Sequence, residues 1–240
     1  MARIISGSRS RWSKDKTVGR RPLEPITSPP ITRRADVIRR VVDLDMPLID
    51  GGEPFRYNDT ALPCTIDEFW AWNGSNLLSN TLRGVLAEFI VAKALGIRLT
   101  QARDEWTEYD LLYPYNGRGV PVEVKSSAYL QTWEQSKPSA IRFGIAPARA
   151  WENQQYADTP KRHAEIYVFC LFAYQDMETK AIAKPMQLEQ WEFYVLETSK
   201  LDALGTQHSL SLRRLKTLQP VSCTYATLKE TVDTILRKYA

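Results

Sequence analysis

Three charged side chains gather in the stretch from Tyr109 to Lys125, which reads YDLLYPYNGRGVPVEVK. Asp110 stands near its start, and Glu123 and Lys125 stand at its end. Because side chains two residues apart in a strand point to the same face, we expect Glu123 and Lys125 to lie side by side. Two carboxylates and an ammonium beside a hydrophobic interior lose hydration energy unless they pair or bind a cation. Oxygen ligands of this kind suit Mg²⁺, with Mn²⁺ as a substitute.

A β-hairpin is predicted to position these charges. Asn116 to Gly119 is a turn-forming run, and the residues on both sides of it alternate as strands do. Val122 and Val124 fall on the face opposite Glu123, where they would meet a hydrophobic core.

A helix from about Asn76 to Leu95, ended by Gly96, is predicted before the hairpin. It carries Glu88 among apolar residues, and we expect it to be mostly buried behind a broad arc formed by Leu78, Leu82, Val85, Leu86, Phe89 and Ile90. Small neighbours one turn away, Gly84 and Ala92, would let a metal or another element approach Glu88. Alternatively, Glu88 forms a salt bridge to Arg83 or Lys93.

The pattern Asp-x₁₂-Glu-x-Lys resembles the motif of the PD-(D/E)XK nuclease superfamily, also called restriction-endonuclease-like. Tyr109 stands where the nominal proline of that motif would be. The resemblance covers roughly Asn80 to Gln131, including a glutamate-bearing helix before the hairpin. It implies an α/β fold with a mixed central β-sheet flanked by helices, a restriction-endonuclease-like core.

The resemblance also implies roles for single residues. Mg²⁺ would be held by Asp110, Glu123, the main-chain carbonyl of Val124 and Glu88. Lys125 would orient the attacking water or stabilise developing charge. Ser126 and Ser127 would contact phosphate and Gln131 would orient water or a base, unless these three simply belong to a loop.

The function implied is that of a Mg²⁺-dependent endonuclease, acting on DNA and leaving 5′-phosphate ends. Double-stranded DNA is the expected substrate, since it is the commonest one in the superfamily, and restriction or phage defence is the expected setting. Two alternatives stay open: a catalytically idle relative that binds nucleic acid, and an RNA nuclease.

Other enzyme classes have little support. His163 and His208 are the only histidines, and Gly-x-Ser-x-Gly is absent, which argues against histidine-based zinc sites and Ser-His-Asp catalysis. Phosphate-binding motifs such as Gly-x₄-Gly-Lys-Ser/Thr are also absent.

Charge divides the chain of 240 residues into two predicted parts. Residues 1–34 form an arm rich in Arg, Ser and Pro, and residues 35–240 form one nuclease-like domain. Residues 1–40 hold 11 Lys or Arg against 3 Asp or Glu, a net charge of +8; since the whole chain carries +4, the remainder carries −4. A basic arm on an acidic body indicates a polyanionic partner.

Location and assembly follow from weaker signals. Three widely spaced cysteines and the lack of a signal-peptide core indicate the cytoplasm, and no apolar run is long enough to span a membrane. Cleaving both strands of a duplex favours a homodimer, with Phe69 to Trp72 and the C-terminal region as candidate contacts.

Further elements are predicted on both sides of the hairpin. Thr65 begins a short aromatic helix and Thr224 a final one, while 35–44 and 148–156 read as further helices. Leu210 to Leu218 fits strand or helix. Three strands are predicted after the hairpin, the second of them buried on both faces: Ile141 to Ala146, Glu165 to Tyr174 and Trp191 to Leu196.

Overall fold

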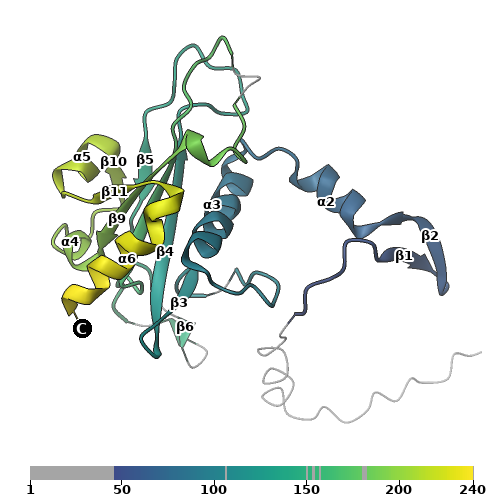
Figure 1. The fold of residues 1–240 in the computed structure, drawn as a ribbon, viewed down its shortest axis with the longest axis horizontal. Coiled ribbons are helices and arrows are strands. Elements are labelled where there is room, and N and C mark those ends of the chain that lie inside the picture. The colour runs from purple at the N-terminus through teal and green to yellow at the C-terminus, as the bar shows by residue number, and fades with distance from the viewer. Residues whose placement is uncertain are drawn as a thin grey trace, which may run out of the picture. The chain divides into compact units, whose positions relative to one another are not determined.

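A five-stranded mixed sheet organises the computed structural model, which describes residues 46–105, 107–149, 151–152, 155–156, 158–179 and 183–239 (Figure 1). The predicted basic arm and the helix expected over 35–44 therefore lie outside the described residues. The sheet has the order β11-β9-β8-β4-β3, and only the β4–β8 pair is parallel. Its strands are β3 (Leu111–Tyr115), β4 (Arg118–Ala128), β8 (Ile166–Phe172), β9 (Trp191–Glu197) and β11 (Val221–Cys223). The prediction of a mixed central sheet is confirmed.

The predicted hairpin is β3 and β4, joined by Asn116 and Gly117. Both turn residues have positive φ, 47° and 79°, as a type I′ hairpin turn requires. Gly119 is needed for a different reason: a Cβ at this position would lie 2.8 Å from the side chain of Leu112. The turn chemistry therefore sets the β3–β4 register, in which Leu111 pairs with Val122.

Strand β4 runs further than predicted, because β8 continues beside it as far as Ala128. Ser126 pairs with Cys170 and Ser127 with Leu171 in this parallel ladder. Both serines are thus part of the strand, so the alternative that they belong to a loop was wrong.

Strand β8 is buried along its whole length, as predicted for a central strand. Alternate residues face two separate hydrophobic clusters, one on each side of the sheet. Ile166, Val168, Cys170 and Phe172 belong to the first cluster. Tyr167, Phe169 and Leu171 belong to the second.

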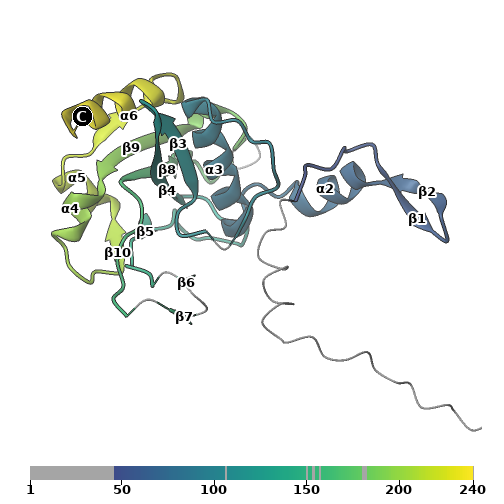
Figure 2. The ribbon, with the colours of Figure 1, turned by 90° about the horizontal axis from the view of Figure 1, so that it is seen from below.

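Helices α3 (Asn80–Leu95) and α6 (Leu228–Leu236) supply the first cluster and lie on the same side of the sheet (Figure 2). Helix α3 begins later than predicted because the Ser79 hydroxyl accepts a hydrogen bond from the Leu82 N–H and caps the helix there. It ends at Gly96, whose φ of 75° is the left-handed conformation expected of a terminating glycine.

The buried face of α3 differs from the predicted arc. Ala87 and Ala92, which were expected to widen the arc, are fully buried, but so is Val91, which was not expected, whereas Phe89 is half exposed. Close approach of the helix to the sheet favours small side chains at the contact, so Phe89 was wrongly expected in the core.

The second face of the sheet is covered by short elements: β5 (Arg142–Gly144), β10 (Ser209–Ser211), α4 (Thr198–Asp202) and α5 (Leu212–Thr217). The ambiguous segment 210–218 thus divides into a strand and a helix, at the point where the Ser211 hydroxyl caps α5. The final helix is confirmed, with α6 preceded by a 3₁₀ turn (Tyr225–Thr227) and followed by another (Arg237–Tyr239). A further 3₁₀ turn (Leu188–Gln190) precedes β9.

The helix expected over 148–156 is wrong. Trp151–Glu152 (β6) and Gln155–Tyr156 (β7) pair as two short antiparallel strands. Bulky aromatic residues in this segment fit a strand better than a helix.

Before α3, β1 (Pro54–Tyr57) and β2 (Thr60–Thr65) form a separate two-stranded sheet, followed by α2 (Ile66–Gly74). The predicted aromatic helix is confirmed: Thr65 precedes it and its hydroxyl contacts the Asp67 carboxylate. None of its residues is buried. In the part of the chain that the structure describes, no helix is long and apolar enough to cross a membrane.

Candidate active site

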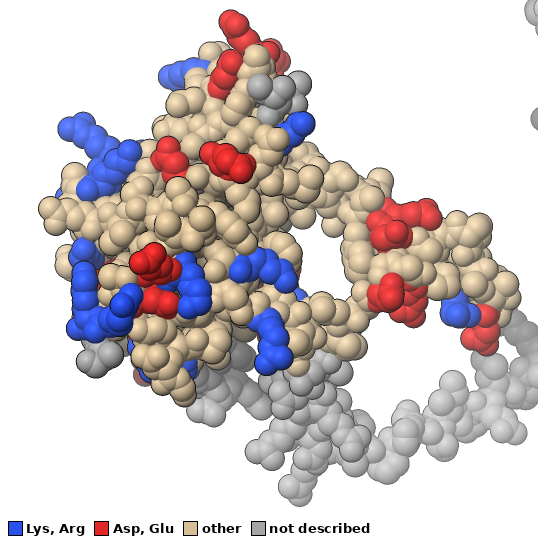
Figure 3. Space-filling view, in the orientation of Figure 1, with Lys and Arg blue, Asp and Glu red and all other residues tan. Residues whose placement is uncertain are grey.

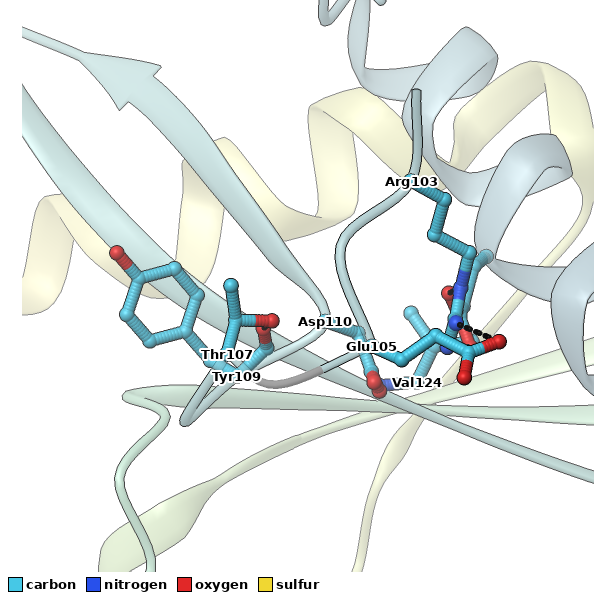
Figure 4. A network of polar contacts seen from close by, with 7 residues as sticks. Arg103, Glu105, Thr107, Tyr109, Asp110 and Val124 are labelled. Carbon is cyan, nitrogen blue, oxygen red and sulfur yellow. Dashed lines mark hydrogen bonds and ion pairs between the residues drawn. The ribbon is translucent and has the colours of Figure 1, made fainter. Parts of the chain in front are cut away.

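Asp110 stands at the last position before β3, at the edge of the sheet. Its carboxylate Oδ2 accepts a hydrogen bond from the main-chain N–H of Val124 over 2.7 Å. The β3–β4 ladder starts one pair away, with Leu111 opposite Val122. Asp110 therefore caps the strand edge just beyond the hairpin pairing, beside the residue that separates Glu123 from Lys125 (Figure 4).

Glu123 and Lys125 project from β4 on the face opposite Val122 and Val124, as predicted. Both valines are buried in the cluster formed with α3 and α6. The Lys125 ammonium contacts the Glu123 carboxylate. Their side chains remain 30% and 17% exposed, so solvent or a ligand can reach the pair.

The charges at this site interact strongly enough to shift a pKa. Burial raises the pKa of Asp110 to about 6, and the nearby negative charge of Glu123 adds to the effect. The Val124 N–H and the Lys125 ammonium lower the Asp110 pKa, and the negative charge of Glu88 raises it slightly. The structure thus brings Asp110, Glu123 and Lys125 together, with Glu88 nearby.

Glu88 forms an ion pair that was not predicted. Its two carboxylate oxygens accept from Arg103, which donates from Nε over 2.5 Å and from Nη2 over 2.9 Å. The suggested partners are engaged elsewhere: Arg83 donates to Leu78 and Asn80, and Lys93 lies over the Phe89 ring.

Arg103 was missed because a single base in a loop carries little sequence signal. It lies in the loop between α3 and β3, seven positions before Asp110, so the only clue was its place between the two acidic elements. The structure identifies it through contact with a residue fifteen positions away.

The three residues expected to contact substrate are largely enclosed. Ser127 and Gln131 are buried, and the Gln131 side chain donates to the Ala128 carbonyl over 3.0 Å. The Ser126 hydroxyl is buried and has no hydrogen-bond partner among the described residues. By strand alternation, Ser126 shares the face of Val124, and Ser127 shares that of Lys125.

The oxygen ligands at this strand edge match what Mg²⁺ requires. Across the described residues, no three His, Cys, Asp or Glu side chains are grouped as a metal site. Asp110 and Glu123 supply two carboxylates, and Mg²⁺ commonly needs only one or two, with water and substrate phosphate completing its shell. The Val124 carbonyl lies at the same strand edge as its N–H, because both groups of one strand residue point to the same side. The residues fit Mg²⁺.

Comparisons with known proteins bear on the family. The family model described as bacteriophage T4 endonuclease IV matches residues 63–214, a range that contains every candidate site residue. Among solved structures, the bacterial homing endonuclease I-Ssp6803I is 18% identical, covers 56% of this chain and 78% of its own, and has a TM-score of 0.31. At that score the likeness carries no weight. No curated protein matches.

Proposed function

This chain belongs to the bacteriophage T4 endonuclease IV family, and from that membership we propose that it hydrolyses phosphodiester bonds of DNA at Asp110, Glu123 and Lys125. The observation that carries the proposal is the meeting of these three charges at one strand edge. Burial and Glu123 together raise the Asp110 pKa to about 6, which is an unfavourable arrangement for the protein alone. A cation beside the two carboxylates would relieve it.

Mg²⁺ is the proposed metal, held by Asp110, Glu123 and the Val124 carbonyl, with Mn²⁺ as a substitute. When bound, it would lower the pKa of a coordinated water and offset negative charge on the phosphate. Glu88 is already paired with Arg103, so we propose that it acts through water rather than as a direct ligand. We also propose that the chain belongs to the restriction-endonuclease-like superfamily.

Lys125 has a separate task in the proposed reaction. Its ammonium is held beside Glu123, where it can orient the attacking water and stabilise charge that develops on phosphate oxygens. The water gives up one proton to solvent as its oxygen bonds to phosphorus, while the bond from phosphorus to the 3′-oxygen breaks. The displaced oxygen takes up a proton, which leaves a 5′-phosphate and a 3′-hydroxyl.

Double-stranded DNA is the proposed substrate, and the cytoplasm is the proposed location of the protein. Restriction or phage defence is the proposed role. The candidate residues line neither the cavity of about 420 Å³ between residues 75–78 and 183–187 nor the smaller one of about 260 Å³ beside Tyr194 and Lys216.

A homodimer would provide one site for each strand of a duplex. Most exposed large apolar side chains of the described residues lie between Met46 and Trp72, and Trp72 is 83% exposed. This segment holds Asp50, Glu53, Asp59, Asp67 and Glu68 against the single base Arg56, and acidic side chains predominate on it in Figure 3. Its negative charge disfavours DNA, and its exposed apolar side chains suit a protein partner, which we propose to be a second copy of the chain.

Incubation of the protein with end-labelled duplex DNA, single-stranded DNA and RNA, in Mg²⁺ or in EDTA, tests the proposed function. We expect cleavage of duplex DNA in Mg²⁺ only, with ends that ligate without kinase treatment. Cleavage of RNA alone would replace the DNA assignment. A folded protein that binds DNA and cuts nothing in Mg²⁺ or Mn²⁺ would identify an idle relative.

A further inference from the structure

Arg103 is anchored to Glu88 at one edge of its guanidinium. Nε and Nη2 each donate to one oxygen of Glu88. The Glu88 side chain is 13% exposed and that of Arg103 is 39% exposed, so the pair reaches from the surface of α3 into solvent. A two-point contact with a carboxylate fixes the plane of the guanidinium.

The remaining edge of Arg103 carries Nη1, which lies 3.7 Å from Glu105 Oε1. That separation exceeds a hydrogen bond, and the Glu105 side chain is 79% exposed. An ion pair of this kind contributes little, because water screens it and two flexible side chains must be held. Nη1 can therefore bind another anion with little loss of free energy from the contact with Glu105.

Arg103 also lies close to the proposed reaction site. Figure 4 shows Arg103 and Glu105 approaching from the loop that leads into Asp110. The hydrogen bond with Glu88, and less strongly the charges of Glu88, Asp110 and Glu105, raise the pKa of Arg103. Arg103 thus stays cationic, and the negative charge of Asp110 is close enough to contribute to this.

We infer that Arg103 binds a phosphate of the nucleic acid next to the bond that is cut, and that Glu88 is the residue that positions it. This inference rests on the proposed nuclease function. Ser126, Ser127 and Gln131, the residues predicted from the sequence for this task, present buried polar atoms. Arg103 presents a partly exposed cation close enough to Asp110 to feel its charge, and among the described residues its Nη1 makes no hydrogen bond.

The test compares Arg103→Gln with Arg118→Gln. Arg118 makes a matching two-point pair, with Glu165, but it lies at the hairpin end of β4. Arg118 lies seven positions before Lys125 along the strand, roughly 23 Å at 3.3 Å per residue. In both variants glutamine removes the positive charge and the two-point contact with the glutamate, so the two substitutions are matched chemically.

Binding of a labelled 30-base-pair duplex is measured in EDTA, where metal-dependent cleavage does not occur, over a series of KCl concentrations. Arg103→Gln should weaken binding and flatten the log–log salt slope by about 0.9, the loss of one phosphate contact. Arg118→Gln and the charge-retaining Arg103→Lys should keep the slope of the unchanged protein. Glu88→Gln should keep it too, since the cation remains, while raising KM for cleavage.

A purely structural role for Arg103 predicts different results for the same variants. If Arg103 only ties its loop to α3, Arg103→Gln and Glu88→Gln lower the melting temperature together and neither changes the slope, which overturns the inference. Equal flattening by Arg118→Gln would also overturn it, because the effect would then be a general loss of charge. Cleavage by the unchanged protein decides the nuclease function separately, so the two proposals can fail independently.

Discussion

At the scale of single residues, Asp110 is the group whose negative charge is most disfavoured at the site. Its carboxylate is held by the Val124 N–H and faces Glu123, so a negative charge is placed where burial and a like charge both oppose it. Lys125 only partly compensates, because its ammonium contacts Glu123 rather than Asp110. Exchanging single side chains should therefore separate metal binding from catalysis.

Lys125→Ala and Asp110→Ala should differ in what they abolish. Without Asp110, cleavage should be lost and metal binding should weaken. Without Lys125, a cation is removed from beside two carboxylates, so Mg²⁺ binding should survive or tighten while cleavage collapses, since the lysine acts in the transition state. Calorimetric Mg²⁺ titration and a cleavage assay check both variants, with DNA binding in Ca²⁺ as the control for folding. Full cleavage by folded Lys125→Ala protein would contradict the proposed site.

The raised pKa of Asp110 predicts a pH-dependent stability. Between the ordinary aspartate pKa near 4 and the folded value of about 6, the folded protein binds more protons than the unfolded one, so stability falls as pH rises through this window. Asp110→Asn keeps an acceptor for Val124 and removes the charge. It should stabilise the metal-free protein at pH 7 by at most about 3 kcal/mol, and by almost nothing below pH 4. Urea unfolding at both pH values measures this difference. Equal stability of the two proteins at pH 7 would show that Asp110 carries no unfavourable charge.

At the scale of elements, the β3–β4 hairpin and helix α3 hold the site together from opposite directions. The hairpin sets Asp110 against Val124, and α3 brings Glu88 to the loop through Arg103. Each element contains a glycine with a different backbone requirement. Gly117 has a left-handed φ of 79°, whereas Gly84 lies inside α3 with nothing within 4 Å of an added Cβ.

Alanine at these two glycines should have opposite effects. Gly117→Ala places a Cβ in a left-handed turn and should destabilise the protein by about 1 kcal/mol. Gly84→Ala replaces a flexible helical residue with the best helix former and should stabilise it by about 0.5–1 kcal/mol. Chemical denaturation of both variants gives the two signs directly. Destabilisation by Gly84→Ala would mean that another side chain needs this space.

At the scale of the whole molecule, charge is divided between the basic N-terminal residues and the rest of the chain. Residues 1–40 carry +8 and the others −4. The site itself is acidic before any metal binds, so long-range attraction to DNA must come from elsewhere.

Deletion of residues 1–34 should weaken DNA binding and flatten its salt dependence. Each Lys or Arg that reaches a phosphate of duplex DNA contributes about 0.9 to the log–log slope. Cleavage at saturating DNA should be retained, because every proposed site residue lies after this arm. Binding isotherms over a salt series measure the change, and an unchanged slope would show that the arm does not contact DNA.

Replacement of the exposed indole should report on self-association. If the apolar surface from Met46 to Trp72 contacts a second copy, Trp72→Glu should shift a dimer to monomer, because it places a charge on an 83% exposed apolar contact. Analytical ultracentrifugation with and without DNA measures this, and Trp133→Glu, at a half-exposed residue outside that surface, serves as control. A monomer under all conditions would remove the dimer proposal.

The local features of the site were determined by the sequence alone. The Asn116-Gly117 turn, the shared face of Glu123 and Lys125, and the buried strand β8 depend on backbone preferences and side-chain alternation within a few residues. Physical rules of this short range can be read from one chain, and the structure confirms them.

Only the tertiary structure decided which segments meet. Arg103 reaches Glu88 across fifteen residues, and β8 extends β4 through Ser126 and Ser127, so two expected loop residues became strand residues. Phe89 was displaced from the core by smaller neighbours on the same helix. These outcomes depend on packing between distant segments, where burial and ion pairing are set by the neighbours that arrive, and a periodic pattern does not contain that information.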